Sequence, residues 1–506
     1  MATPSEKLAE SLTVLKQLQE DGNVAIRSTN LARTHRERLL KNGFLQEIMK
    51  GWYITTNPSE RAGDSTAWYT SFWSFCSSYL QERFGENWCL SPEQSLLLHV
   101  ANRTVPKQLL VRSDKAHNSV IQLPYATSIL EICANQPDPH IIVQDGLRIY
   151  SIQYALISCP ASFYQQNPTD VRAALTMIRD ASEILELLIE GSHTTIAGRL
   201  AGAFRNIGQE RIADDIITTM RSIGYDVREQ DPFEKKTPSL ILNTAEHSPY
   251  VNRLKLMWQE MREPIIEIFP KSLGLTQNID TYLQDIEANY TTDAYHSLSI
   301  EGYKVSPELI TKVHTGNWNP GKEDKQDYNA LAARGYWQAY RSVRESLIAV
   351  LNGENSGDVA GRDHRNWYRE MFLPSVTAGI IKPIDLAGYR SAPVYIRQSM
   401  HVPPAKSIIR ELLPAFFDLL RTETEASVRI VLGHFLFVYI HPYMDGNGRI
   451  GRFLMNVMCA SGGYPWLTVP VEKRDLYMNT LEKASTSSDI KPFAHFIGSL
   501  VEGKSG

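Results

Sequence analysis

The stretch from His441 to Arg452 constrains this chain more than any other. It reads His-Pro-Tyr-Met-Asp-Gly-Asn-Gly-Arg-Ile-Gly-Arg, so a histidine, a carboxylate and two arginines stand among three glycines. Such a polar, glycine-rich string is poor material for a hydrophobic core. Apolar runs flank it at 430–440 and 453–459, and each has the composition of a buried helix. The stretch therefore predicts a loop between two buried helices.

The glycines and arginines of this loop indicate a phosphate site. Gly446 and Gly448 allow backbone N–H groups to turn inward just before a helix, where unpaired N–H groups and the helix dipole favour an anion. Arg449 and Arg452 stand three residues apart, so both face the same side of the second helix and add positive charge there. We therefore expect the loop to bind the phosphates of a nucleotide.

Two further groups suit chemistry on that phosphate. Asp445 can hold a magnesium ion on phosphate oxygens. His441, at the end of the first helix, has a side chain of near-neutral pKa that suits it to take a proton from an attacking hydroxyl. The alternative is a tight helix–loop–helix connection with solvated charges, but the full set of chemically matched groups favours the nucleotide site.

The stretch resembles the signature of the Fic family, His-x-Phe-x-Asp/Glu-Gly-Asn-Gly-Arg-x-x-Arg, with Tyr443 where phenylalanine is usual. The usual activity of that family is transfer of AMP from ATP to a protein hydroxyl. The resemblance implies that His441 is the base and that Asp445 holds Mg²⁺. It also implies an anion cradle and a polyphosphate clamp, made of Gly446, Asn447, Gly448, Arg449 and Arg452.

Composition sets broader limits. The chain has 506 residues, 43% of them hydrophobic and 21% charged, which suits a globular protein of two to four domains. A formal charge of −4 offers no general attraction to nucleic acid or membrane. The five cysteines are scattered without metal-binding spacing, the N-terminus lacks the apolar run of a signal peptide, and no segment reaches membrane-spanning length. We expect a cytoplasmic protein without a membrane partner, and leave its oligomeric state open, a homodimer being one option.

The predicted architecture is mainly α, in three parts. Residues 1–60 predict a winged-helix head, residues 61–235 a mixed α/β scaffold or sensory module, and residues 245–505 a Fic-type helical core. A linker is predicted at Glu234–Ser239, where charge and proline interrupt the pattern.

The head is predicted to contain helices at 5–20 and 31–42 and a hairpin at 44–54. It resembles, over a short block, the winged-helix heads of AbiEi-type regulators and antitoxins. Between residues 27 and 50 the sequence has six basic residues and two acidic ones. This excess of positive charge suits a contact with the DNA backbone by Arg33, Arg36 and Arg38. An amphipathic helix with a solvated basic face is an equal alternative.

The middle region carries no recognisable catalytic set. Its pattern predicts helices at 66–84 and 171–190, strands at 108–112 and 140–143, and a helical hairpin over 196–224 broken at Gly208. After it, residues 250–268 predict a helix kinked at Pro264 and stopped by Pro270.

A second motif stands before the core. Ser297-Leu-Ser-Ile-Glu301-Gly302 places a serine and a glutamate on one face of a helix around 290–302, with a glycine suited to the helix end. It resembles the inhibitory motif of the Fic family. The resemblance implies that Glu301 pairs with Arg452, which takes the cation needed by the γ-phosphate and leaves ATP in an unproductive pose. The alternative is a helix-terminal Ser–Glu pair without a distant partner.

Two further segments concern the substrates. Residues 388–404 alternate as a hairpin does, and resemble the family's flap, whose edge docks the target protein; the docking residues would be Val394, Tyr395 and Ile396. An ordinary packed hairpin is the alternative. Tyr477, in a segment resembling the helix that closes the nucleotide pocket, is suited to stack on the base. The usual Tyr-Tyr pair is Tyr477-Met478 here, so the base is less defined than the phosphates, and Tyr477 as plain core is the alternative.

These observations favour an autoinhibited enzyme that transfers AMP from ATP to a Ser, Thr or Tyr hydroxyl of a target protein or of itself. A second enzymatic interpretation is removal of AMP by water that the glutamate activates. The rival interpretation is a transcriptional regulator whose head binds DNA, and whose Fic half senses nucleotide or modifies the regulator itself.

Overall fold

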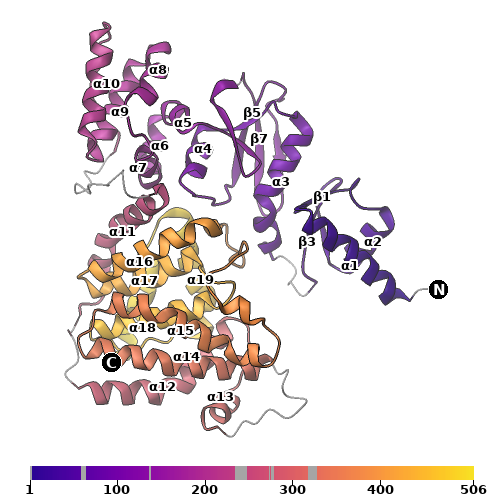
Figure 1. Cartoon of the computed structure of the whole chain (residues 1–506), viewed down its shortest axis with the longest axis vertical. Coiled ribbons are helices and arrows are strands. Elements are labelled where there is room, and N and C mark those ends of the chain that lie inside the picture. The colour runs from indigo at the N-terminus through magenta and orange to yellow at the C-terminus, as the bar shows by residue number, and fades with distance from the viewer. Residues whose placement is uncertain are drawn as a thin grey trace. The chain divides into compact units, whose positions relative to one another are not determined.

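The computed structural model describes residues 3–58, 64–135, 138–233, 248–272, 274, 278–316 and 328–505. The chain forms two compact units (Figure 1). Unit 1 comprises Met1–Arg253 together with Tyr395–Val402, and unit 2 comprises Leu254–Val394 and Pro403–Gly506. The linker predicted at Glu234–Ser239 lies outside the described residues. Helices dominate the described chain, which confirms the mainly α prediction.

The first 58 residues form two helices and a small sheet. α1 (Pro4–Glu20) starts in a capping box between Thr3 and Glu6, and α2 (Arg33–Lys41) packs on it. The strands β1 (Ala25–Arg27), β2 (Leu45–Met49) and β3 (Trp52–Thr55) pair antiparallel in the order β1-β3-β2. Buried leucines of the helices pack against residues of the sheet in one small core. The two helices and the hairpin predicted here are confirmed, while the winged-helix assignment stays a prediction.

The next part of unit 1 is a mixed α/β layer. α3 (Thr66–Phe84) packs an aromatic face against the sheet formed by β4 (Cys89–Leu90), β5 (Gln108–Ser113), β7 (Ser128–Cys133) and β6 (Val120–Gln122), in that order. β5 and β7 run parallel. β8 (Ile141–Gln144) and β9 (Leu147–Tyr150) form a hairpin, preceded by a 3₁₀ turn (Asp138–His140), and α4 (Pro92–His99) joins β4 to β5. Trp52 and Ile54 of β3 belong to the same core.

Short helices complete unit 1: α5 (Ile152–Ser158), α6 (Ala161–Gln166), α7 (Pro168–Leu175), α8 (Ser182–Glu190), α9 (Thr194–Asn206) and α10 (Glu210–Ser222). The single helix predicted over 171–190 is wrong, because α7 and α8 are separate. Asp180 and Glu183 accept hydrogen bonds from backbone N–H groups of residues 179, 180 and 182, and so start a new helix there. The hairpin of α9 and α10, broken at Gly208 with φ +77°, is confirmed.

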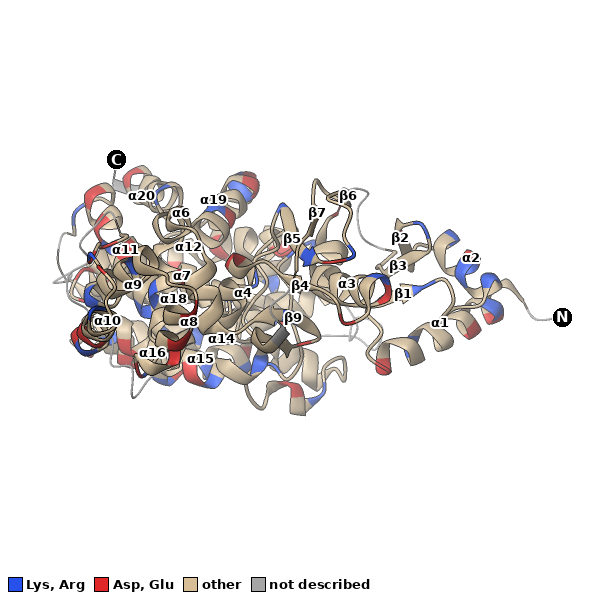
Figure 2. Cartoon of the chain, turned by 90° about the horizontal axis from the view of Figure 1, so that it is seen from above, with Lys and Arg blue, Asp and Glu red and all other residues tan. Residues whose placement is uncertain are grey.

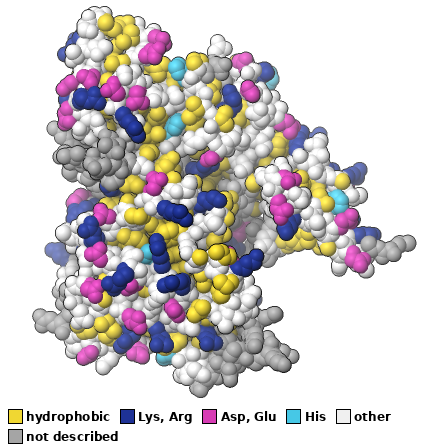
Figure 3. Space-filling view, in the orientation of Figure 1, with side chains coloured by type: hydrophobic (Ala, Val, Ile, Leu, Met, Phe, Trp, Pro, Cys, Tyr) yellow, Lys and Arg dark blue, Asp and Glu magenta, His cyan; other side chains and the backbone are white. Residues whose placement is uncertain are grey.

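The face over α9 and α10 mixes both signs of charge (Figure 3). Arg205 pairs with Asp214 and Glu229, and Arg211 pairs with Asp180. This face therefore offers no single-sign field to a nucleic acid.

Unit 2 is a helical bundle around α17 (Ala426–Ile440) and α18 (Asn447–Ser461), whose residues are nearly all buried. Around them stand α11 (Pro249–Ile268), α12 (Ile279–Ile300), α13 (Pro307–His314), α14 (Tyr328–Leu351), α15 (Ser356–Thr377), α16 (Ile409–Thr422), α19 (Arg474–Ser487) and α20 (Lys491–Ser505), with short 3₁₀ turns at Pro383–Leu386, Lys406–Ile408 and Val471–Lys473. None of the helices in the described ranges is long and apolar enough to cross a membrane.

The β-hairpin expected at 388–404 is not formed. No strand occurs in this segment, and its residues 395–402 belong to unit 1. Prolines at 393, 403 and 404 remove backbone donors that a strand ladder needs. In place of a ladder, the Arg390 side chain donates to the carbonyls of Ala392 and Pro404, one on each limb of the loop.

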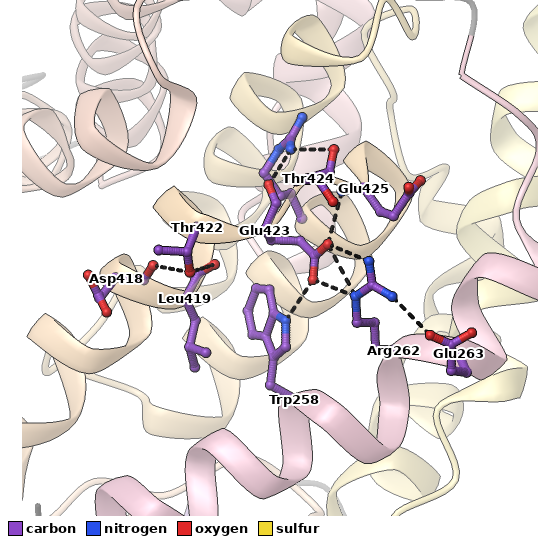
Figure 4. Close-up of polar contacts among 10 residues, drawn as sticks. Trp258, Arg262, Glu263, Asp418, Leu419, Thr422, Glu423, Thr424 and Glu425 are labelled. Carbon is purple, nitrogen blue, oxygen red and sulfur yellow. Dashed lines mark hydrogen bonds and ion pairs between the residues drawn. The ribbon is translucent and has the colours of Figure 1, made fainter. Parts of the chain in front are cut away.

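A polar junction sets the start of α17. Glu423, which is buried, accepts hydrogen bonds from Trp258 and from Arg262 of α11, with Arg262 Nε 2.9 Å from its carboxylate (Figure 4). Its other contact is the N–H of Glu425, one residue before α17. Because the carboxylate is fully engaged, the junction anchors the helix that ends at the candidate site.

Candidate active site

The loop of the His441–Arg452 stretch joins two buried helices, as predicted. α17 ends at Ile440, and His441 adopts the left-handed conformation at φ 53°, ψ 60°. Gly446 is also left-handed, at φ +79°, and α18 starts at Asn447. A left-handed histidine is uncommon outside turns, so its neighbours must hold it in place.

The loop is held from inside by aromatic stacking and by one amide. The ring of Tyr443 stacks on Tyr368 with centroids 3.8 Å apart and an interplanar angle of 5°. The Asn447 side chain accepts from the N–H of Tyr443 at 2.9 Å and donates to its carbonyl at 2.8 Å. Asn447 was expected in the anion cradle, but its side chain makes hydrogen bonds that fix the conformation of the loop.

His441 is oriented as a base. Its Nδ1 lies 3.0 Å from the carbonyl oxygen of Val438, and because a carbonyl only accepts, Nδ1 carries the proton. Nε2 is then the unprotonated nitrogen of the neutral ring. Burial, with a contribution from the nearby Arg390 cation, lowers the pKa of His441 to about 4. The ring is therefore neutral at pH 7 and able to accept a proton.

Arg390 holds the loop that begins at His441 in place. Its Nε donates to the carbonyl of His441 at 2.8 Å, and its N–H donates to the carbonyl of Pro442 at 2.9 Å. The guanidinium is buried, and within the part of the chain that the structure describes it donates to carbonyls and not to carboxylates. Burial lowers the pKa of Arg390 to about 10. The motif did not point to Arg390, because the residue lies 51 positions before His441 in sequence.

The two glycines stand where a side chain would collide. A Cβ on Gly446 would lie 2.8 Å from the ring of Phe372, and one on Gly448 would lie 2.6 Å from Oε1 of Glu301. The N–H of Gly446 donates to Oδ1 of Asp445 at 2.6 Å, and the N–H of Gly448 lies in the first turn of α18, where it has no intrahelical acceptor. This arrangement suits the anion cradle expected there.

Arg449 and Asp445 form one side of the site. Arg449 is 1% exposed, and its Nη2 lies 3.2 Å from Oδ2 of Asp445, which is 56% exposed. The guanidinium lies over the rings of Tyr303 and Phe372, 5.1 Å from each centroid. The described residues contain no cluster of three or more His, Cys, Asp or Glu side chains for a metal. A single exposed carboxylate beside a phosphate cradle nevertheless suits Mg²⁺, which commonly takes one carboxylate together with phosphate oxygens.

Arg452 forms the other side of the site, where residues at the end of α12 accept its hydrogen bonds. Its Nη2 lies 2.6 Å from Oε1 of Glu301 and donates to the carbonyl of Ser297 at 3.1 Å, while its Nε donates to the hydroxyl of Ser297 at 3.0 Å. Burial alone would raise the pKa of Glu301, but Arg452 and Arg449 hold that pKa below its ordinary value. Gly302 ends the helix at φ +93°. The expected ion pair between Glu301 and Arg452 is present.

Side chains that the motifs did not indicate hold α12 in this position. Buried Asp293 accepts from the hydroxyls of Tyr336 at 2.7 Å and Thr468 at 2.9 Å. Arg474 donates to the carbonyl of Ile300 at 2.9 Å. Asp293 lies about one turn before Ser297 on the buried face of α12, and a carboxylate at such a position is a sequence signal for this support.

Tyr477 lies in the core, which favours the alternative left open from sequence. It is 1% exposed, its hydroxyl is 2.7 Å from Nε2 of His434, and its ring packs with Phe493 and Phe496. A base cannot stack on a ring that is enclosed in this way without rearrangement. The structure therefore offers no open base platform at Tyr477.

The predicted docking residues lie at a unit boundary. Val394 is buried at the end of one segment of unit 2, whereas Tyr395 and Ile396 belong to unit 1. Within unit 1 the segment is tied by Arg397 to Asp64 at 2.9 Å and by the N–H of Gln398 to Thr66. Target docking on these residues stays a prediction.

All three arginines predicted to contact DNA make contacts within the head. They belong to α2, which carries several blue Lys and Arg segments in Figure 2. Arg33 pairs with Glu37 at 2.6 Å on the surface. Arg36 donates to the carbonyl of Ser28, and Arg38 donates to the carbonyl of Lys7 and the hydroxyl of Ser11. Binding DNA would have to break or share these contacts, and it stays a prediction.

Comparison with known proteins agrees with the family resemblance of the His441–Arg452 stretch. Residues 365–459 match the Fic/DOC family. The chain is 29% identical over 217 residues, 42% of its length, to the protein adenylyltransferase Fic of Drosophila willistoni, and 29% over 255 residues, 49% of its length, to that of Nematostella vectensis. It spans 40% and 56% of the lengths of those two relatives.

Among solved structures, a fragment of Fic-1 from C. elegans is similar at 21% sequence identity and a TM-score of 0.37, over 67% of this chain and 96% of that one. The match to the Fic/DOC family thus covers residues 365–459 of unit 2, which include the loop from His441 to Arg452.

Proposed function

We propose that this protein transfers AMP from ATP to a Ser, Thr or Tyr hydroxyl of a protein, and that α12 holds the enzyme in a resting state. The observation that carries the proposal is the state of His441. Its Nδ1 is committed to a carbonyl and its pKa is lowered to about 4, so Nε2 is a free base at neutral pH. It stands on the same loop as the glycines and arginines suited to phosphate.

The proposed reaction needs positioning and electrostatics more than covalent participation by the enzyme. His441 Nε2 takes the proton of the acceptor hydroxyl, and the oxygen forms a bond to the α-phosphorus of ATP. The bond from that phosphorus to the bridging oxygen breaks, and pyrophosphate leaves. The N–H groups at the start of α18 and the Arg449 guanidinium offset the charge of the phosphates. Asp445 would hold Mg²⁺, which, when bound, supplies further positive charge to the phosphate oxygens.

The resting state follows from the contacts of Arg452. Glu301 and Ser297 occupy Nη2 and Nε of its guanidinium, the pair of donors that would hold a phosphate in a bidentate way. Glu301 also lies against Gly448, within reach of the cradle. We therefore expect ATP to bind in an unproductive pose until α12 moves, and the target to approach along the extended segment at Val394, Tyr395 and Ile396 by strand addition.

The test compares label transfer from ATP labelled on its α-phosphate. Wild type should label weakly, and Glu301→Gly should label roughly 5 to 150 times faster, the range of a coupling of 1–3 kcal/mol. His441→Ala in the Glu301→Gly background should lose about 10²-fold or more. Glu287→Gly, at an exposed position of the same helix, controls for a glycine in α12. Intact mass measurement should find added AMP; activation by Glu287→Gly, or label in the His441→Ala variant, contradicts the proposal.

A second activity, hydrolysis of an existing AMP–protein bond, is favoured by the state of Glu301. Arg452 and Arg449 hold its pKa below the ordinary value, so Glu301 is ionised at neutral pH, and its side chain, 24% exposed, can accept a hydrogen bond from a water molecule beside the loop. Incubating a pre-modified target with wild type and with Glu301→Gln tests this. Loss of AMP should occur only with wild type, and equal loss with both would contradict it.

The cytoplasm remains our proposed compartment. All five cysteines are free, and four of them are buried. Paired cysteines would be expected of a chain folded in an oxidising compartment. Fractionation of the native host cells, followed by detection of the chain, is the direct test.

A further inference from the structure

A cavity of about 380 Å³ opens in unit 2 next to the catalytic loop. Tyr368 and Phe372 of α15 form one wall, Met444 and Asp445 of the loop form another, and Arg449 lies between them. The volume is within the range of pockets that bind ligands. Two of its lining residues, Asp445 and Arg449, take part in the proposed reaction, but that reaction gives no role to the rest of the cavity, and Tyr477 does not line it.

The mouth of this cavity is unusually apolar for a surface. Tyr328, Ile380 and Met444 line the cavity and are each among the exposed large hydrophobic side chains. Leu373 and Ile384 are exposed beside lining residues, and Ile384 is 73% exposed. An apolar surface gathered around a pocket marks a place where another molecule binds.

The charges at the mouth are acidic. Asp385 and Asp445 line the cavity, and both are exposed. Among the residues that line it, Arg449 is the one cation, and that guanidinium is buried and paired with Asp445. The exposed carboxylate of Asp385 accepts the backbone N–H of Lys382 at 3.3 Å, and the one cation of the cavity lining pairs with Asp445 and not with Asp385. An apolar group accompanied by a positive charge complements such a site.

The cavity is also close to the reacting groups along the chain. Met444 follows His441 by three residues, and Ser391, another lining residue, follows Arg390, which donates to the carbonyl of His441. A group bound in the cavity would therefore contact the loop that carries His441 and the segment next to Arg390.

From this geometry we infer that the cavity selects the protein substrate. It takes a bulky apolar side chain of the target segment, next to the residue that carries the acceptor hydroxyl, and Asp385 takes a Lys or Arg beside that side chain. The inference rests on the proposed function, since it assigns the cavity to the protein acceptor rather than to ATP.

The experiment measures binding without catalysis, so that the two ideas fail separately. Full-length His441→Ala protein, without nucleotide, is used to select from a random peptide library. Enriched peptides should pair an aromatic or large aliphatic residue with Lys or Arg, and one such peptide is then measured by fluorescence polarisation. Ser375→Phe, which fills the cavity from α15, should weaken it about tenfold or more, and Asp385→Asn should weaken peptides with the basic residue only.

Controls address folding and the nucleotide. Both variants should keep the thermal unfolding profile and the calorimetric affinity for Mg-ATP of the parent protein. No enrichment, enrichment that Ser375→Phe does not disturb, or loss of Mg-ATP affinity in Ser375→Phe would each overturn the inference, the last because it would place the nucleotide base in the cavity. Peptide binding without any AMP transfer by the Glu301→Gly protein would leave the subsite standing and refute only the proposed reaction.

Discussion

Arg449 and Arg452 stand about one turn apart on α18 and are equally buried, yet their partners differ. Arg452 is bound by Ser297 and Glu301, residues more than 150 positions away on α12. Arg449 is paired with Asp445, which stands four positions earlier in the sequence and is about half exposed. Both residues line an open cavity. The same residue type in one motif is thus paired with a distant helix in one case, and with its own loop beside an open cavity in the other. The difference shows that the neighbouring helix, and not the motif, sets what each arginine can do at rest.

The largest test of this difference is the loss of each cation. Arg452→Met removes the cation that pairs with Glu301, whose side chain is 24% exposed, and should lower the free energy of unfolding of unit 2 by about 2–3 kcal/mol. Arg449→Met releases an exposed carboxylate to water and should cost about 1 kcal/mol or less through the ion pair. Urea unfolding, followed by hydrogen exchange in α12 and α18, gives both values. Equal losses would contradict the distinction between the two arginines.

The charge of Glu301 should show itself in the pH dependence of stability. Because the folded-state pKa of Glu301 lies below its ordinary value near 4.3, its stabilising contribution is complete above that ordinary value and is lost as pH falls through the lower folded pKa. Glu301→Gln should therefore be less stable than wild type by about 2 kcal/mol at pH 7. The difference should shrink below about pH 4. A difference that stays constant to the lowest pH reached would mean that Glu301 contributes by shape and not by charge.

Arg390 tests whether the base depends on a residue outside the motif. Arg390→Met removes the donor to the His441 carbonyl and a nearby positive charge, so the pKa of His441 should rise. In the Glu301→Gly background, kcat should fall roughly tenfold with little change in KM for ATP, because the base is misplaced and the phosphate cradle is not. NMR titration of the labelled histidine ring measures the pKa directly. Arg397→Met, in the same loop but on unit 1, is the matched control. An unchanged His441 pKa would refute this role.

The smallest effect should come from Ser297. Ser297→Ala removes one of three donations by Arg452 and leaves the carbonyl and Glu301 contacts. One hydrogen bond of about 1 kcal/mol corresponds to activation of about fivefold, well short of Glu301→Gly. Label transfer compared across wild type, Ser297→Ala and the control Ser299→Ala measures the activation. Ser299 lies on the same helix, but the Arg452 guanidinium donates to Ser297 and Glu301. Activation as large as that of Glu301→Gly would show that Ser297 is the main lock.

Local pattern predicted much of the fold. Helices with strong periodicity or clear breakers, such as α3, α9 and α10, were located correctly, because the spacing of apolar residues and the glycine at 208 act within one or two turns. The helix over 171–190 was placed wrongly, since the side chains of Asp180 and Glu183 that split it act on backbone groups that periodicity does not report. The hairpin at 388–404 failed for a related reason: alternation predicts strands only where a partner strand supplies hydrogen bonds.

The candidate site divides in the same way. A contiguous motif is visible in sequence because all its members lie within one loop and one helical turn, so the base, the carboxylate, the glycines and both arginines were identified from residues alone. The sequence also carried the short Ser297–Gly302 pattern, whose partner came only through a family resemblance. The roles of these residues in catalysis and inhibition await the experiments above.

Long-range packing accounts for what the residues alone left open. The packing of α12 on α18 pairs Glu301 with Arg452, a contact across 151 positions of sequence. Packing also enclosed Tyr477 in the core, turned Arg390 toward His441, and left the cavity beside Asp445 open. Each of these depends on which helix faces meet, and no local spacing encodes that, because burial and hydrogen bonding of a side chain are set by neighbours that arrive from distant parts of the chain.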